Sequence, residues 1–109
     1  MIVDLRIYTC KPGRMVEFVL LYEKMAWPIQ KKYLGRCLGW YTTIEGRQNT
    51  VMHLWAYDSQ AEREQRRKLM VADPAFTAYL EAVTKADLLV DMENRIVTPT
   101  SFSPYCSIP

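Results

Sequence analysis

His53 is the single histidine among the 109 residues, so it is the obvious candidate for proton transfer near neutral pH. It lies in the stretch 50–57, where alternating side chains indicate a strand. With a period of two, His53 shares one face of that strand with Val51, Trp55 and Tyr57. An imidazole in such a setting can act as a general base or as a hydrogen-bonding group for a ligand.

Two interpretations of His53 are open at this point. In the structural one, His53 packs beside Trp55 and one ring nitrogen is hydrogen-bonded to a carboxylate such as Glu93. In the functional one, Glu93 orients His53 as a general base or ligand-binding group, and Tyr8 and Trp55 form the walls of the site. His53 and Tyr8 are then the candidate catalytic residues, although no spacing motif marks either of them.

The elements that must position these residues follow one another as strand, helix, two strands, helix and strand. Their expected ranges are 2–9, a helix kinked near Trp27 by Pro28, 36–44, 50–57, 59–71 with a restart at Asp73, and 88–97. Ser59 with Glu62 has the spacing of a capping box. The order βαββαβ predicts a ferredoxin-like α+β fold, an antiparallel four-stranded sheet with both helices on one face. We expect residues 1–98 to form this domain and residues 99–109 to form an extended tail.

The alternation divides the predicted sheet into two faces. One face is uniformly apolar, and we expect both helices to cover it; its residues are Val3, Leu5, Ile7, Met52, Leu54, Ala56, Val90 and Met92. The other face is aromatic and charged, with Asp4 at its edge; its residues are Arg6, Tyr8, Tyr41, His53, Trp55, Tyr57, Asp91, Glu93 and Arg95. A second copy of the chain would cover that face and leave a semi-polar cavity, because open sheet faces rarely carry so many aromatic side chains. The candidate ligand-binding residues are therefore Arg6, Tyr8, Tyr41, His53, Trp55 and Glu93.

Composition excludes several other classes of protein. The net charge of +2 comes from interleaved acidic and basic residues, which argues against nucleic-acid binding. No apolar run is long enough to insert into a membrane, and the N-terminus is not a signal peptide, so we expect a cytoplasmic protein. Three scattered cysteines and one histidine predict no metal site, and four scattered glycines form no phosphate loop. We expect no cofactor.

The chain resembles the NIPSNAP family over most of its length. The resemblance lies in residues 4–9 followed by Lys11-Pro12-Gly13, in Leu38-Gly39-Trp40-Tyr41, in residues 51–67 and in Asp73-Pro74. It implies a ferredoxin-like domain that dimerises into an α/β barrel, but it implies no established reaction.

Three functions are compatible with these observations. The first is a homodimer that binds a small, partly apolar molecule. The second, resting on fold analogy, is a cofactor-independent monooxygenase or isomerase-like enzyme acting on aromatic or lactone substrates. The third is a non-catalytic scaffold or interaction protein, which would need no pocket.

Overall fold

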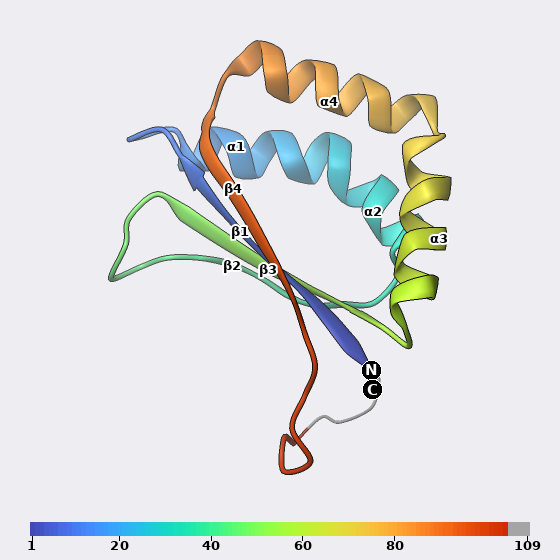
Figure 1. The fold of residues 1–109 in the computed structure, drawn as a ribbon. Coiled ribbons are helices and arrows are strands. Elements are labelled where there is room, and N and C mark those ends of the chain that lie inside the picture. The colour runs from blue at the N-terminus through green and yellow to red at the C-terminus, as the bar shows by residue number, and fades with distance from the viewer. Residues whose placement is uncertain (105–109) are drawn as a thin grey trace.

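The computed structural model describes residues 1–104 and contains the expected order of strands and helices (Figure 1). The elements are β1 (Ile2–Cys10), α1 (Met15–Leu21), the π-helical turn η1 (Tyr22–Ala26), α2 (Trp27–Tyr33), β2 (Cys37–Thr42), β3 (Thr50–Tyr57), α3 (Gln60–Val71), α4 (Pro74–Ala86) and β4 (Leu89–Val97). The α+β, βαββαβ prediction is confirmed.

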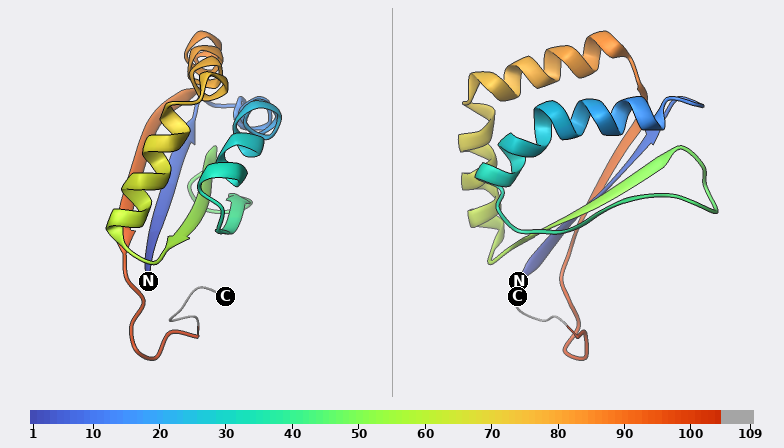
Figure 2. Two further views of the ribbon diagram at one scale, coloured as in Figure 1. Left: turned by 90° about the vertical axis from the view of Figure 1, so that its right-hand side faces the viewer. Right: turned by 180° about the vertical axis from the view of Figure 1, so that it is seen from behind.

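The four strands form one antiparallel sheet in the order β2-β3-β1-β4, with all helices on one side (Figures 1 and 2). Both views of Figure 2 place α1 alongside α4. The molecule measures 40 × 36 × 18 Å, and its smallest dimension corresponds to one helix layer on one sheet. Within residues 1–104, no helix covers the other face of the sheet.

Local sequence signals fix the helix ends. The Ser59 hydroxyl accepts a hydrogen bond from the Glu62 backbone N–H at 3.1 Å, as the capping-box spacing predicts. The Asp73 carboxylate accepts from the Ala75 N–H at 2.8 Å, and Pro74 is the first residue of α4. The kink expected near Trp27 takes the form of the π-helical turn η1, which immediately precedes Trp27-Pro28.

The prediction of which face the helices cover is wrong. His53 is 0% exposed, Trp55 1% and Tyr8 5%, whereas Met52 on the other face is 37% exposed. The aromatic face is therefore the core, where the helices contribute further rings. On the outer face Leu5, Ile7 and Leu54 are half-buried and Met52 is exposed, whereas Val3 and Ala56 are buried.

Register explains why several charged residues were also assigned to the wrong face. Leu5 pairs with Arg95 and Ile7 pairs with Glu93, so Glu93, Arg95 and likewise Asp91 share the outer face with the apolar residues of β1. Met92, predicted on the apolar face, pairs with Tyr8 and lies on the helix side. Tyr41 pairs with Met52 on the outer face and is 56% exposed.

Beyond β4, a turn brings the Ser103 N–H within 3.1 Å of the Thr100 carbonyl oxygen. The last part of the predicted tail, residues 105–109, lies outside the described residues. Within residues 1–104, no helix has the length and apolar character needed to span a bilayer.

Candidate functional site

His53 lies at the centre of a group of aromatic rings between the sheet and the helices. Its imidazole stacks on Trp40 of β2, with ring centroids 5.0 Å apart and an interplanar angle of 20°. Tyr8 of β1 meets it edge-on at 5.0 Å, and Tyr22 of η1 does so at 5.6 Å. Strand pairing places Arg6 of β1 opposite His53 of β3 on the inner face of the sheet. η1 packs on the same face, and its Tyr22 is buried there.

One hydrogen bond defines which ring nitrogen of His53 carries the proton, and burial keeps the ring neutral. The Trp55 indole N–H donates to His53 Nδ1 at 2.7 Å, so the imidazole proton lies on Nε2. Burial, followed by the positive charge of Arg6, lowers the pKa of His53 to about 3. Within residues 1–104, Nε2 has no hydrogen-bond partner. His53 is therefore a neutral donor near pH 7, and the nitrogen that could accept a proton is already engaged.

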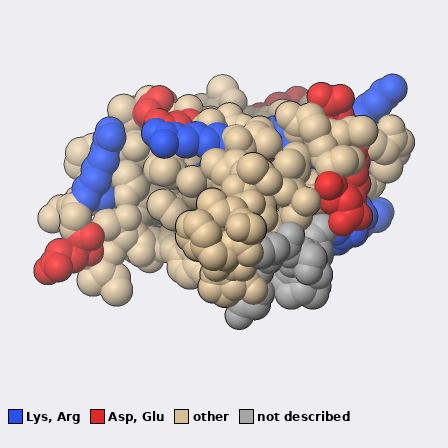
Figure 3. All heavy atoms as spheres, turned by 60° about the horizontal axis from the view of Figure 1, so that its bottom comes forward, with Lys and Arg blue, Asp and Glu red and all other residues tan. Residues whose placement is uncertain are grey.

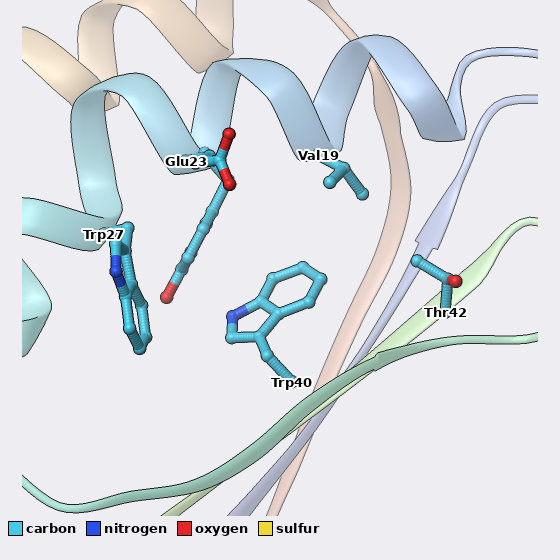
Figure 4. Close-up of a pocket in the computed structure, with 6 residues that line it drawn as sticks. Val19, Glu23, Trp27, Trp40 and Thr42 are labelled. Atoms are coloured by element: carbon cyan, nitrogen blue, oxygen red, sulfur yellow. The ribbon is translucent and has the colours of Figure 1, made fainter.

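A pocket of about 410 Å³ lies beside this group, between the first helical segment and β2 (Figure 4). The helical segment contributes Val19, Tyr22, Glu23 and Trp27, and the strand contributes Trp40 and Thr42. Spacings of four bring Val19, Glu23 and Trp27 to one side of the helix, while alternation brings Trp40 and Thr42 to one side of β2.

The pocket combines aromatic walls with one carboxylate. Burial raises the pKa of Tyr22 well above its ordinary value, so its phenol stays neutral, and its hydroxyl donates to the Gln30 side-chain oxygen. Glu23 is exposed and takes part in no hydrogen bond or ion pair with the described part of the chain. The site can therefore hold a flat apolar group and offer one negative charge.

The structure brings together only part of the predicted site. Tyr8, His53 and Trp55 meet in the core, and His53 supports Trp40 from behind. Arg6 shares that face, and its Nε donates to the Tyr8 hydroxyl at 2.8 Å. Tyr41 and Glu93 lie on the opposite face, so the predicted contact between His53 and Glu93 is wrong.

None of the pocket-lining residues was predicted as a site residue; they are Val19, Tyr22, Glu23, Trp27, Trp40 and Thr42. The spacing of four along the helix was an available signal, but nothing in the sequence set the face on which Trp40 lies. A register shift between Cys37 and Gly39 decides that face. Among residues 1–104, no group of three or more histidine, cysteine or acidic side chains could hold a metal ion.

Comparison with known proteins assigns the chain to a family. The NIPSNAP family model matches residues 3–104. The chain belongs to the NIPSNAP family. Among solved structures, an uncharacterised NIPSNAP-like domain protein from Burkholderia xenovorans is 39% identical with a TM-score of 0.87, covering 99% of this chain and 90% of that one. A NIPSNAP family protein of unknown function from Agrobacterium tumefaciens is 33% identical with a TM-score of 0.88, covering 95% and 92%.

Curated NipSnap relatives match this chain with only part of their length. Human NipSnap homolog 3A is 30% identical over 105 residues, which are 96% of this chain and 40% of that protein. A putative NipSnap protein of Caenorhabditis elegans is 30% identical over 92% of this chain and 18% of its own length. One structure described as an antibiotic biosynthesis monooxygenase and two described as putative antibiotic biosynthesis monooxygenases share the fold at TM-scores of 0.60 to 0.65 with 10–13% identity. That similarity concerns the fold alone.

Proposed function

We propose that this NIPSNAP protein is a homodimer in which each subunit binds a small, largely apolar molecule in the pocket between the first helical segment and β2. The observation that carries the proposal is the pocket itself. Its volume of about 410 Å³ is within the usual range for small-molecule sites, and Trp27 and Trp40 provide aromatic surface for a flat ligand.

Glu23 gives the expected ligand its polarity. A carboxylate at an aromatic wall favours a ligand that has a hydrogen-bond donor or a positive charge at one end. Glu23 is free to receive such a group because it has no ion pair within the described residues. The preferred ligand is thus an aromatic or aliphatic molecule with an amino group or another donor.

The outer face of the sheet supports the homodimer. At its centre Leu5 pairs with Leu54 and Ile7 pairs with Met52, which makes a contiguous apolar patch on two neighbouring strands. In the view of Figure 3, which brings the bottom of Figure 1 forward, most of the charged side chains lie toward the edges. Two such faces packed against each other would bury both patches, as in an isologous interface. The outer face of the sheet, and not the aromatic inner face, is thus the proposed contact between subunits.

Binding without catalysis fits His53 better than proton transfer does. A general base needs a free acceptor nitrogen and a pKa near the working pH, and His53 has neither. Tyr8, His53 and Trp55 therefore act as the support behind Trp40, and Arg6 holds Tyr8.

A pocket-filling variant tests the proposal. The probes are neutral N-phenyl-1-naphthylamine and the cation 1-naphthylmethylammonium, and the measurement is fluorescence titration. Thr42→Trp should weaken binding of both probes tenfold or more, because the exposed Thr42 side chain lines the pocket. Thr42→Val keeps the side-chain shape and should bind as the wild type does. Glu23→Gln should weaken binding of the cation and leave the neutral probe unchanged.

If each probe binds Thr42→Trp as tightly as it binds the wild type, the pocket is not the binding site. Loss of binding in Thr42→Val as well as in Thr42→Trp would place the effect in the strand rather than in the pocket. A Glu23→Gln variant that still prefers the cation would refute the role of the carboxylate.

A further inference from the structure

A second cluster of polar side chains lies on the inner face, centred on Asp4 of β1. The Asp4 carboxylate is 1% exposed and accepts from Arg6 Nη1 at 3.1 Å and from Arg63 Nε of α3 at 3.0 Å. Its other oxygen accepts from Asn94 Nδ2 of β4 at 3.2 Å. These contacts hold two guanidinium groups side by side, because buried carboxylates need paired charges and hydrogen bonds.

The cluster has more positive charge than its carboxylate can neutralise. Arg67, one helical turn beyond Arg63, is partly buried next to the same groups. Burial, followed by the charges of Arg6 and Arg63, lowers the pKa of Arg67. Within residues 1–104 its guanidinium has no hydrogen bond or ion pair. Three arginines thus face one aspartate, which leaves two positive charges in excess.

A buried hydroxyl group adjoins the arginines. Tyr57 is 0% exposed, and its hydroxyl has no hydrogen-bond partner within the described residues. Burial and the charge of Asp4 raise the pKa of Tyr57 to about 12, while Arg67, Arg63 and Arg6 act in the opposite direction. The phenol is therefore protonated near pH 7 and available as a donor, although buried donors usually have an acceptor.

Solvent reaches this part of the inner face beside β4. Met92 is 55% exposed and Ile96 is 39% exposed, although register places both on the side of the sheet that the helices cover elsewhere. The Arg6 and Arg63 side chains each keep 15% of their surface exposed. The Trp27–Trp40 pocket lies at the opposite side of the sheet, where β2 is the edge strand. The cluster is thus a separate place on the molecule.

We propose that Arg6, Arg63 and Arg67 form a second ligand site, which binds the oxyanion group of a ligand, a phosphate or a carboxylate. Guanidinium groups bind both kinds of oxyanion through paired N–H donors. Asp4 keeps Arg6 and Arg63 in place and leaves their remaining N–H groups for the ligand. Tyr57 supplies a neutral donor beside them. The excess charge that destabilises the free protein becomes the attraction for the anion.

Thermal unfolding with inorganic phosphate tests this assignment, at pH 7 and at constant ionic strength set with sodium chloride. The melting temperature of the wild type should rise with phosphate and reach saturation, since a ligand that binds only the folded state stabilises it. Arg67→Met should lose the response to phosphate. In the absence of phosphate the same variant should melt at a higher temperature than the wild type, because it removes an unpaired, repelled charge.

Arg47→Met is the matched control, because Arg47 is exposed in the loop between β2 and β3, at the other edge of the sheet from β4, and its side chain has no hydrogen bond or ion pair within the described residues. It should keep the full response to phosphate. Acetate and benzoate in place of phosphate distinguish a carboxylate ligand from a phosphate ligand. A larger rise in melting temperature with acetate or benzoate than with phosphate identifies a carboxylate ligand. No anion-specific shift over chloride would overturn the proposal, and so would an unchanged shift in Arg67→Met. Loss of the homodimer in Arg67→Met would also overturn it, since the cluster would then serve the subunit contact.

Discussion

Mild acid should destabilise this protein through one side chain, His53. Its pKa is about 3 in the folded chain, because of burial, compared with 6.5 for an unperturbed histidine. Between these values the unfolded chain binds one proton more than the folded chain, so the free energy of unfolding falls as the pH falls. The stabilisation that neutral His53 provides is complete above the pKa of His53 in the unfolded chain. It is lost as the pH falls toward the pKa in the folded chain. From pH 7 to pH 5 this amounts to about 2 kcal/mol, and a folded pKa one unit higher changes that figure little.

The pH window isolates His53 from other groups. It is the only histidine, and the lowered pKa values of Asp4 and Glu62 move their effects on stability to lower pH. Burial raises the pKa of the Cys10 and Cys37 thiols, which places their titration above this range.

Urea unfolding at pH 7 and pH 5, at one ionic strength and one protein concentration, measures the difference. His53→Gln is the non-titrating control, and its free energy of unfolding should be nearly equal at the two pH values. At pH 7 this variant should lose about 1–3 kcal/mol, because the buried Trp55 N–H loses its acceptor. Equal stability of the wild type at the two pH values would contradict this effect of His53, and so would a His53→Gln variant that keeps the wild-type difference.

Three further outcomes check other parts of the structure. Light scattering should give about twice the 12.8 kDa chain mass. Leu54→Lys on the outer face should halve the measured mass. Val16→Lys, at a site 68% exposed on α1, should leave the measured mass unchanged. Ser59→Ala should lower the free energy of unfolding by about 1 kcal/mol in urea, because the Glu62 N–H loses its cap, and Ser59→Thr should restore most of it. Cys10, which is 1% exposed, should react with a thiol reagent only after denaturation; rapid reaction in the native protein would contradict its burial.

Helix and strand positions could be predicted from the sequence because their signals are local. The capping box at Ser59, the Asp73-Pro74 start and the alternation along β1 and β3 involve neighbouring residues and need no tertiary information. The order of the elements then limited the fold to a small set, and the ferredoxin-like arrangement followed.

The face of the sheet that the helices cover could not be predicted from such local signals. Alternation shows which residues share a face, but not which face the helices cover. Asp4 and Arg6 made the inner face look unsuitable for a core, yet Arg6 donates to Asp4, which also accepts from Arg63 and Asn94. The faces of β4 depend on its register with β1, which is shifted between Thr9 and Cys10.

The pocket could not be predicted from the sequence, because its two walls, a helix and an edge strand, come together only in the tertiary structure. Trp40 and Tyr41 are neighbours in the sequence, and either could have faced the core. The register shift beyond Cys37 turns Trp40 inward onto His53 and leaves Tyr41 outside.

The inner face thus carries two different kinds of chemistry, and Arg6 lies between them. Toward β2 the rings around His53 form a neutral wall, and among residues 1–104 the pocket's single carboxylate is that of Glu23. Toward β4 the arginines around Asp4 carry the excess positive charge. Arg6 belongs to that cluster, donates to the Tyr8 hydroxyl and lowers the pKa of His53. Burial is the main cause of the lowered pKa of His53, and within the charge cluster Arg6 adds to this effect while Asp4 opposes it, so the imidazole stays neutral beside the aromatic pocket.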